Sequence, residues 1–517
     1  MTEQPAQPSQ QSQSTQSAQP TPSAQRAAPS QLSSVQHIVQ LMLENRSFDH
    51  MLGFLYPNKT GPNGQPFEGL LGTETNKDTN GNPVTVYQID MTSPNAYFMP
   101  GADPGEGYAN TNSQLFGTGK PPSIPVATNE GFVTNFDAAV SYDQRSGRTV
   151  LANTTANEIM GIYPPSALPI LTGLAKGFAI CDHWYSSVPT ETFPNRAFAC
   201  AATSQGHMND ATSSYTVQSI FGLMTKHELG WKIYGYDAEP LTRASFPDTM
   251  DAPETCFGKF ADFQADAAAG NLPAYSFLEP GWGSAGNSQH PNYDVALGEA
   301  LILDVYHALR NGPGWDQTLL IISYDEHGGC YDHVPPPAGA TPPDSTPGEF
   351  GFDFTRFGVR VPAVLVSPLI PAGTIYRVPA DSTPIDHTSV LKTIELRWGL
   401  PALTARDAAA PDLGGVLTLS AARTDDPLAG VSAPVSSGPN PAAGEVSQLQ
   451  TLQAQDVSNL QVPLDELRNA PLLANQHTPA DYQNYIESRT ATWKAAKARG
   501  QAPSRDTSPP DEDGGAN

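Results

Sequence analysis

The chain has 517 residues, and its 44 Gly and 50 Pro follow no G-X-Y period, so a collagen-like fibre is excluded. Asp and Glu number 52 against 27 Lys and Arg, which gives a formal net charge of −25 at pH 7. A surface of this sign repels phosphate backbones, and we therefore expect no nucleic-acid partner. An anionic substrate would need a local positive centre, which a bound metal ion commonly supplies.

The sequence also bears on membranes, export and redox state. No run of about 18 apolar residues is present, so we expect no transmembrane segment. The first residues lack the basic start and apolar stretch of a secretory signal. Two locations stay open: the cytoplasm, or export by a route without such a signal. Four cysteines are widely spaced, and we expect free buried thiols at Cys181, Cys200, Cys256 and Cys330.

Composition divides the chain into five parts. The two ends are rich in polar residues and Pro, without an apolar period, and are expected to be disordered. Between them we expect a main domain of strands and helices, a linker rich in Ala, Pro, Ser and Gly, and a helical C-terminal extension. The predicted parts are 1–34 (tail), 35–425 (main domain), 426–447 (linker), 448–499 (extension, with helices near 448–456 and 478–498) and 500–517 (acidic tail).

Short apolar runs predict the core of the main domain. Their near-continuous apolarity is typical of strands buried on both faces, as in parallel sheets covered by helices. The pattern therefore predicts an α/β fold with a doubly wound, mostly parallel central sheet and helices on both faces. The predicted strands are 38–43, 178–181, 232–234, 275–278, 319–324 and 363–366, and the clearest helices are 296–310 and 388–398.

Polar residues follow four of these strands directly. In open α/β sheets the functional site lies at the carboxyl edge of the strands, so we expect these side chains to converge in one crevice. They are Glu44 and Asn45, Asp182 and His183, Glu279, and the run Asp325-Glu326-His327.

Two of these segments suit a divalent cation, because carboxylate and amide oxygens are hard ligands. The first begins at Asp325 and continues through two glycines to Asp332 and His333. A solvated acidic turn after a strand is the alternative for it. The second pairs Glu44 with Asn45, and the alternative there is an ordinary helix start with Asn45 as its cap.

Hydroxyl groups cluster at 186–192, before a predicted helix. The hydroxyl of Thr192 is a weak nucleophile until a metal or a base lowers its pKa, and a helix start would offer free N–H groups to a phosphate. Arg196 adds a planar fork suited to phosphate. An ordinary Ser/Thr/Pro loop is the alternative. His290 and His387 also precede helices, although a lone histidine is commonly a satisfied core or surface residue.

Taken in order, six motifs are more specific than any one of them. They are ENRSFDH at 44–50, NEGFVTNF at 129–136, TFPNR at 192–196, SQHP at 288–291, YDEHGGCYDHVPPP at 324–337 and DHTSVLKTIE at 386–395. On these motifs, residues 35–425 resemble the bacterial phosphoesterase family of non-haemolytic phospholipases C and respiratory-burst-inhibiting acid phosphatases. The resemblance implies an alkaline-phosphatase-like fold and makes 35–425 the catalytic domain.

The resemblance also implies roles for individual residues. The metal would be held by Glu44, Asn45, Thr192, Asp325 and Glu326, with Thr192 as the nucleophile. The catalytic histidines would be His290 and His387, facing the phosphate or the leaving group. Weaker candidates for substrate binding are Arg196, His327, Asp332 and His333.

The implied activity is metal-dependent hydrolysis of phosphate esters through a phosphothreonine intermediate. The substrate is either a diester, phospholipids included, or a monoester, and the divalent metal is left open among Zn, Ca, Mg and Mn. One departure matters: family members commonly have a histidine in the segment that reads DPGEGY at 103–108 here, and this chain has none. The alternative function is therefore a catalytically impaired binding or effector protein on the same scaffold.

Overall fold

The computed structural model describes residues 1, 30–123, 125–211, 214–458, 460, 462–463, 466 and 471–501. Within them, the largest sheet has the strand order β12-β6-β11-β10-β1-β9-β7-β8. Its strands are β1 (His37–Leu43), β6 (Ala179–Ile180), β7 (Trp231–Gly235), β8 (Phe257–Lys259), β9 (Tyr275–Glu279), β10 (Thr318–Tyr324), β11 (Ala363–Val366) and β12 (Thr374–Ile375). Two small sheets pair β2 (Thr75–Lys77) with β3 (Pro83–Thr85) and β4 (Tyr87–Gln88) with β5 (Gly161–Ile162).

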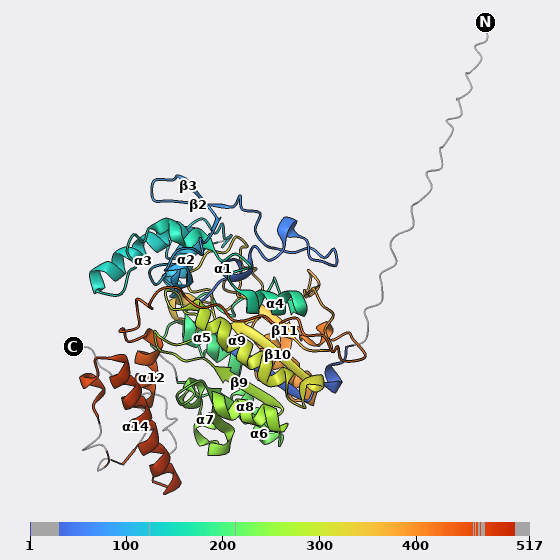
Figure 1. The fold of residues 1–517 in the computed structure, drawn as a ribbon, viewed down its shortest axis with the longest axis vertical. Helices are drawn as coiled ribbons and strands as arrows, with labels where there is room; N and C mark the ends of the chain where they lie inside the picture. Colours follow the sequence, from blue (N-terminus) through green and yellow to red (C-terminus); the bar gives the residue numbers. More distant parts are fainter. Residues whose placement is uncertain are drawn as a thin grey trace.

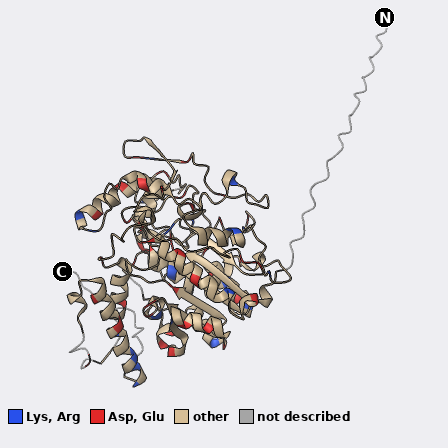
Figure 2. Ribbon diagram, in the orientation of Figure 1, with Lys and Arg blue, Asp and Glu red and all other residues tan. Residues whose placement is uncertain are grey.

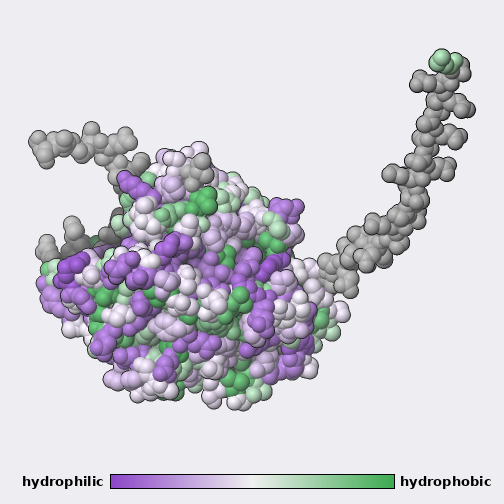
Figure 3. All heavy atoms as spheres, turned by 90° about the horizontal axis from the view of Figure 1, so that it is seen from above, coloured by the Kyte–Doolittle hydropathy of each residue, from purple (hydrophilic) through white to green (hydrophobic). Residues whose placement is uncertain are grey.

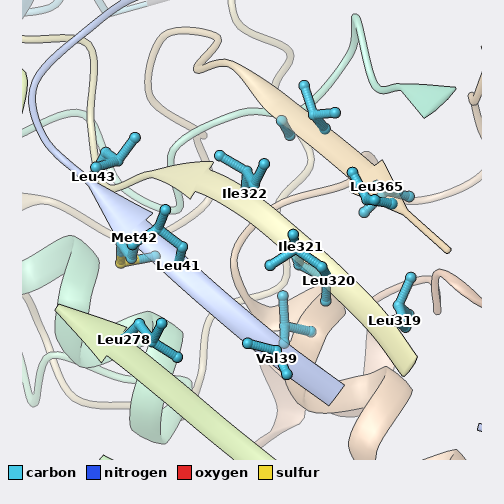
Figure 4. Close-up of a cluster of buried hydrophobic side chains, with 14 of the residues drawn as sticks. Val39, Leu41, Met42, Leu43, Leu278, Leu319, Leu320, Ile321, Ile322 and Leu365 are labelled. Carbon is cyan, nitrogen blue, oxygen red and sulfur yellow. The ribbon is translucent and has the colours of Figure 1, made fainter. Parts of the chain in front are cut away.

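The centre of the large sheet is parallel, as predicted. β1 lies between β10 and β9 and runs parallel to both, whereas β11 is antiparallel to β10 and β6. Figure 4 shows the reason for the apolar runs: side chains such as Val39, Leu41 and Ile321 fill both faces of the strands and are fully buried. A strand covered on both faces has no polar side to alternate with.

Helices cover both faces of the sheet (Figure 1). α4 and α8 both contact α9, and α5 contacts both α6 and α10. The helices are α1 (Phe48–Leu52), α2 (Tyr108–Phe116), α3 (Phe132–Ser146), α4 (Pro169–Gly177), α5 (Thr192–Ala201), α6 (Ile220–Lys226), α7 (Pro247–Asp251), α8 (Phe260–Ala269), α9 (Val295–Arg310), α10 (Thr388–Trp398), α11 (Ala405–Ala409), α12 (Gln448–Ser458) and α14 (Pro479–Ala498).

The domain edges differ from the sequence-based boundaries. A 3-10 helix at Leu32–Ser34 belongs to the folded part, and Ser30 Oγ donates a hydrogen bond to the carbonyl of Gly414 at 2.6 Å. The predicted linker at 426–447 is packed on the domain: Leu428 is buried in the main core, and Ser436 contacts Asp294. The rest of the predicted tails, 2–29 and 502–517, lies outside the described residues.

The C-terminal extension forms the two expected helices. α12 and α14 pack against each other at one side of the molecule (Figure 1). Thr478 caps α14 with a capping box that includes Asp481, followed by proline at the helix start.

Charge and polarity are spread over many elements. Lys and Arg are scattered along the ribbon in Figure 2, and polar and apolar residues intermingle on the face shown in Figure 3. A search of the described helices finds none with the length and hydropathy needed to span a bilayer. All four cysteines are free, and three of them are buried, with Cys256 half-buried.

Candidate active site

The neighbouring strands β1 and β10 bring the first candidate residues together. Leu43 pairs with Tyr324 in the parallel register, so the residues after them leave the sheet at the same point. The backbone N–H of Asn45 donates to Oδ1 of Asp325 at 3.1 Å, which joins the two strand ends directly. The predicted convergence of Glu44–Asn45 with Asp325–Glu326 is thus present.

Asn45 is held from several sides. Its φ of 55° is left-handed, which asparagine tolerates better than most residues. A Cβ on Gly328 would lie 1.9 Å from the Asn45 carbonyl oxygen, so only glycine fits there. The side-chain Nδ2 of Asn45 donates to Oε2 of Glu106 at 2.5 Å, and its Oδ1 lies 3.4 Å from Oγ1 of Thr192. The contacts fix the amide with its oxygen toward Thr192.

Thr192 is the first residue of α5, so the helix begins within the hydroxyl cluster and not after it, as the sequence had indicated. The next N–H, of Phe193, donates to Oδ1 of Asp210 at 2.8 Å, and the N–H of Asp210 donates to Oε1 of Glu191 at 2.5 Å. Carboxylates therefore satisfy the positive end of the helix. Thr192 is only 1% exposed, and it faces the amide of Asn45 and not packed hydrocarbon.

Arg196 lies one helical turn after Thr192. Its Nε donates to Oδ2 of Asp325 at 2.9 Å, and Nη2 donates to the carbonyl of Leu43 at 3.2 Å. The guanidinium stacks over the Trp282 ring at 4.6 Å. Its Nη1 is buried without a hydrogen-bond partner, so one arm of the fork remains open for an acceptor.

Carboxyl groups crowd this site. Burial, strengthened by Asp325, raises the pKa of Glu44 to about 8. Burial and neighbouring carboxylates also raise the pKa values of Glu326, Glu106 and Asp210 well above the ordinary range. Each of these carboxyls resists ionisation, first because it is buried and then because other carboxylates lie close to it.

These residues fit a divalent cation. The expected ligands, Glu44, Asn45, Thr192, Asp325 and Glu326, offer only oxygen atoms, which suit a hard cation. Oε1 of Glu44 and Oε1 of Glu326 are buried without hydrogen-bond partners, although such oxygens are normally satisfied. A cation would satisfy both oxygens and offset the excess charge.

Three groups within the described residues have carboxylate or imidazole atoms within 4.8 Å of one another: Asp49–Asp332–His333, Asp103–Glu106–His290 and Glu106–Glu191–Asp210. Sequence analysis did not name Glu106 or Asp210 as site residues. The only sequence signal for Glu106 is its place in the segment where the family's histidine is missing.

His290 lies beside the carboxylate of Glu106. Its Nδ1 lies 3.1 Å from the carbonyl of Pro291, so Nδ1 carries the proton and Nε2 is the nitrogen that faces Glu106, at 4.0 Å. Burial lowers the pKa of His290 to about 4. The imidazole is thus neutral in the free protein, and Nε2 is its proton-accepting atom.

His387 differs from the expectation that it faces the phosphate. Its Nε2 donates to the backbone carbonyl of Asp325 at 2.6 Å, and its Nδ1 accepts from Nε1 of Trp184 at 3.3 Å. Burial lowers its pKa to about 4. Because both nitrogens are engaged, His387 fixes the backbone of Asp325 and has no nitrogen left for substrate.

The three remaining candidates make structural contacts. Nε2 of His327 lies 2.7 Å from Oε1 of Gln114, and burial lowers the pKa of His327 to about 3. Asp332 accepts from Nε of Arg360 at 3.0 Å, and His333 Nδ1 lies 2.6 Å from Asp49 Oδ2. The structure gives no support to substrate binding by these residues.

The polar residues that follow two other strands make structural contacts. Asp182 pairs with Arg377 at 2.6 Å. Glu279 accepts from the N–H groups of Leu241 and Thr242 at 2.6 and 2.9 Å. Of the four polar strand ends, only those of β1 and β10 supply residues that contact Thr192 or Arg196 directly.

A doubly wound α/β sheet with buried acids and a hydroxyl at its carboxyl edge is an arrangement typical of enzymes of this fold class. Residues 35–401 match the model of the Phosphoesterase family, and the chain belongs to that family. It is a hydrolase acting on phosphoric ester bonds.

Several known proteins are similar to this chain. The chain is 36% identical to non-specific phospholipase C6 of Arabidopsis thaliana over 77% of this chain and 75% of that one. It is 30% identical to non-specific phospholipase C3 of the same plant, over 90% and 88%. Phospholipase C A of Mycobacterium tuberculosis (strain ATCC 25618 / H37Rv) is 29% identical, over 72% and 74%. A solved protein of the alkaline phosphatase superfamily from Vibrio parahaemolyticus is 12% identical over 49% and 65%, with a TM-score of 0.28.

Proposed function

We propose that the protein hydrolyses phosphodiesters with the aid of a divalent metal, with Thr192 as the nucleophile. The observation that carries the proposal is the position of Thr192 Oγ1, 3.4 Å from Asn45 Oδ1, among buried carboxyls that lack enough positive charge. A merely structural threonine at a helix start would not need such surroundings, because concentrated negative charge destabilises a fold.

The metal would be held by Glu44, Asn45, Thr192, Asp325 and Glu326. When bound, a divalent cation lowers the pKa of a coordinated hydroxyl and offsets charge on the phosphoryl oxygens. The donor set leaves the identity open among Zn, Ca, Mg and Mn.

The protein's own residues carry the remaining steps. Thr192 Oγ1 attacks phosphorus in line, the bond from phosphorus to the leaving oxygen breaks, and a phosphothreonine forms. The open Nη1 of Arg196 donates to a phosphoryl oxygen. His290 moves a proton at Nε2: in the first step it receives the proton of the Thr192 hydroxyl and gives it to the leaving alkoxide, and in the second it receives a proton from the attacking water and returns it to Thr192 Oγ1. His387 holds the backbone of Asp325 in place throughout.

A diester is the substrate class that the relatives favour, because several are named phospholipases C. Monoester cleavage is the second candidate, since the same residues can act on either ester. Parallel assays with p-nitrophenyl phosphorylcholine and p-nitrophenyl phosphate separate the two, and faster turnover of the monoester would reject the diester assignment.

Thr192→Ala tests the nucleophile. We expect loss of nearly all turnover, and wild-type enzyme quenched in acid during turnover of p-nitrophenyl phosphorylcholine should carry a phosphocholine group on the peptide that contains Thr192. The matched control is Thr85→Ala, an exposed threonine in β3, which should keep full activity. Retained turnover in Thr192→Ala would reject the role, as would an inactive wild type that binds metal, which favours the non-catalytic alternative.

A further inference from the structure

The ring of Trp282 lies against one face of the Arg196 guanidinium. The guanidinium carbon is 4.6 Å from the centroid of the ring. Trp282 lies in the loop after β9, which also carries His290, and it has no part in the proposed reaction steps. Arg196 does have a part, because its open Nη1 is proposed to donate to a phosphoryl oxygen. The orientation of this guanidinium therefore bears on the reaction.

Two hydrogen bonds fix one edge of the Arg196 guanidinium. Nε donates to Oδ2 of Asp325 at 2.9 Å, and Nη2 donates to the carbonyl of Leu43 at 3.2 Å. The group is planar, so two bonds along one edge hold that edge but still permit the plane to tilt about it. A tilt would displace Nη1, which has no hydrogen-bond partner in the protein to hold it.

The Trp282 ring opposes such a tilt. The negative face of an aromatic ring attracts a cation, and tryptophan does so more strongly than tyrosine or phenylalanine. Trp282 is only 5% exposed, so water screens this attraction little. With one edge bonded and one face stacked, the guanidinium of Arg196 keeps a single orientation.

Other contacts hold Trp282 itself. Its carbonyl accepts a hydrogen bond from Oγ of Ser447 at 2.5 Å. The side chain belongs to a small buried apolar cluster that also contains Phe193, Leu241 and Leu449. These contacts restrain the ring independently of its stack with Arg196.

A second buried tryptophan provides a contrast. Trp315 is also 5% exposed, and the guanidinium of Arg310 lies over its ring at 5.5 Å. Trp315 lies just before β10, at the end of the strand opposite to Asp325. The same chemical pair therefore occurs once at the candidate site and once away from it.

We propose that Trp282 is a positioning residue that sets the plane of Arg196 and so directs Nη1 toward the phosphoryl oxygen. The inference rests on the proposed function, which gives Arg196 its role. Trp282 acts through Arg196 and does not contact the reacting atoms.

Two substitutions weaken the stack by different amounts. Trp282→Phe keeps a smaller ring, and Trp282→Leu keeps only apolar packing. With p-nitrophenyl phosphorylcholine and the metal-loaded full chain, kcat/KM should fall roughly threefold in Trp282→Phe and roughly tenfold in Trp282→Leu. The affinity for inorganic phosphate, measured by calorimetry, should fall in the same order, with unchanged metal content. Trp315→Phe is the matched control and should stay within about twofold of the wild type.

The deciding measurement is a double-mutant cycle with Arg196→Lys. Lysine keeps the positive charge, but its ammonium group has no plane to orient. Trp282→Leu should therefore change kcat/KM by less than about twofold in the Arg196→Lys background, against roughly tenfold in the wild type. A ring that only supports the fold would cause the same loss in both backgrounds. Phosphate affinity is measured in the same four proteins, so the cycle closes even where turnover is too slow to follow.

The outcomes separate this inference from the function on which it rests. Equal losses in the two backgrounds overturn the positioning role and leave Thr192 catalysis intact, as do wild-type kcat/KM and phosphate affinity in Trp282→Leu. If Trp282→Leu fails to fold in a thermal melt, Trp282→Phe is carried through the same cycle with its roughly threefold expected loss. Wild-type activity in Arg196→Lys would overturn both the inference and the role of Arg196, and a wild type without turnover would overturn the proposed function itself.

Discussion

Two buried charged regions lie at the carboxyl edge of the sheet, and they are built differently. Around Asp49, the charges are matched: Arg360 donates to Asp49 at 2.9 Å and to Asp332 at 3.0 Å, and His333 completes the cluster. Arg360 and His333 hold the pKa of Asp49 below its ordinary value despite burial, whereas burial raises the pKa of Asp332 to about 6. Around Thr192, the carboxyl pKa values instead rise, to about 8 for Glu44.

The difference separates a structural cluster from a functional one. A matched cluster is satisfied within the fold and needs nothing from outside. The carboxyls near Thr192 keep two unpartnered oxygens, on Glu44 and Glu326, and burial opposes their ionisation. Such groups persist in a fold when a ligand or cation compensates them in the working state. Both clusters are acidic in the sequence, and only the partners distinguish them.

The largest expected effect is a loss of turnover and of bound metal when a charge is removed from the carboxyls near Thr192. Asp325→Asn keeps the shape of the side chain but removes a charge that the proposed metal and Arg196 both need. We expect turnover to fall by roughly 10³-fold or more, with loss of bound metal in elemental analysis. Asp316→Asn, at an exposed position, is the matched control. Normal metal content and activity in Asp325→Asn would remove Asp325 from the site.

Removing the positive charge from the cluster around Asp49 should lower the stability of the protein. Arg360→Met leaves Asp49 and Asp332 buried without their cation, and the free energy of unfolding should fall by about 3–5 kcal/mol. Denaturant unfolding of the metal-free protein measures this loss. The folded fraction should keep its metal stoichiometry, since Arg360 contacts none of the proposed ligands. A variant as stable as the wild type would show that the cluster is not a structural unit.

The sequence predicted the position of some candidate residues and not of others, and the reasons are physical. Continuous apolarity located β1 and β10, and their parallel register then places Glu44 and Asp325 together. Asp332 follows Asp325 closely in sequence, but Gly328 and Gly329 have φ values of 59° and 64°, which turn the chain away toward Arg360. Local sequence cannot show that change of direction.

Other features depend on contacts between distant segments. His387 was expected to be catalytic, partly because it precedes a helix. In the structure, Trp184 and the Asp325 carbonyl form hydrogen bonds with its two ring nitrogens. Glu106 lies in a loop without any periodic pattern, and only its hydrogen bond to Asn45 identifies it. The predicted linker was judged by composition, which cannot reveal that Leu428 is buried in the core.

Metal removal should affect the two clusters unequally. A chelator removes the cation that is proposed to bind the carboxyls near Thr192. The wild type should therefore lose stability, by roughly 3 kcal/mol relative to protein at metal concentrations about 100 times the Kd. Glu44→Gln lacks one of the proposed ligands, and its shift on chelation should be much smaller. Differential scanning calorimetry with and without chelator measures both. Equal shifts in the two proteins would place the metal away from Glu44.

The smallest effect concerns the charge of His333, whose pKa is raised because the attraction of Asp49 exceeds the cost of burial. Since the pKa in the folded state lies above the unfolded value of about 6.5, the contribution to stability is complete below that pH. It is lost as pH rises through the folded value. His333→Gln should therefore destabilise the protein by about 1 kcal/mol at pH 5.5 and by less at pH 8.5. His37→Gln, a half-buried histidine that contacts the Pro273 carbonyl, is the control. A larger loss at pH 8.5 than at pH 5.5 would mean that His333 is neutral in the fold, and that Arg360 alone balances Asp49 and Asp332.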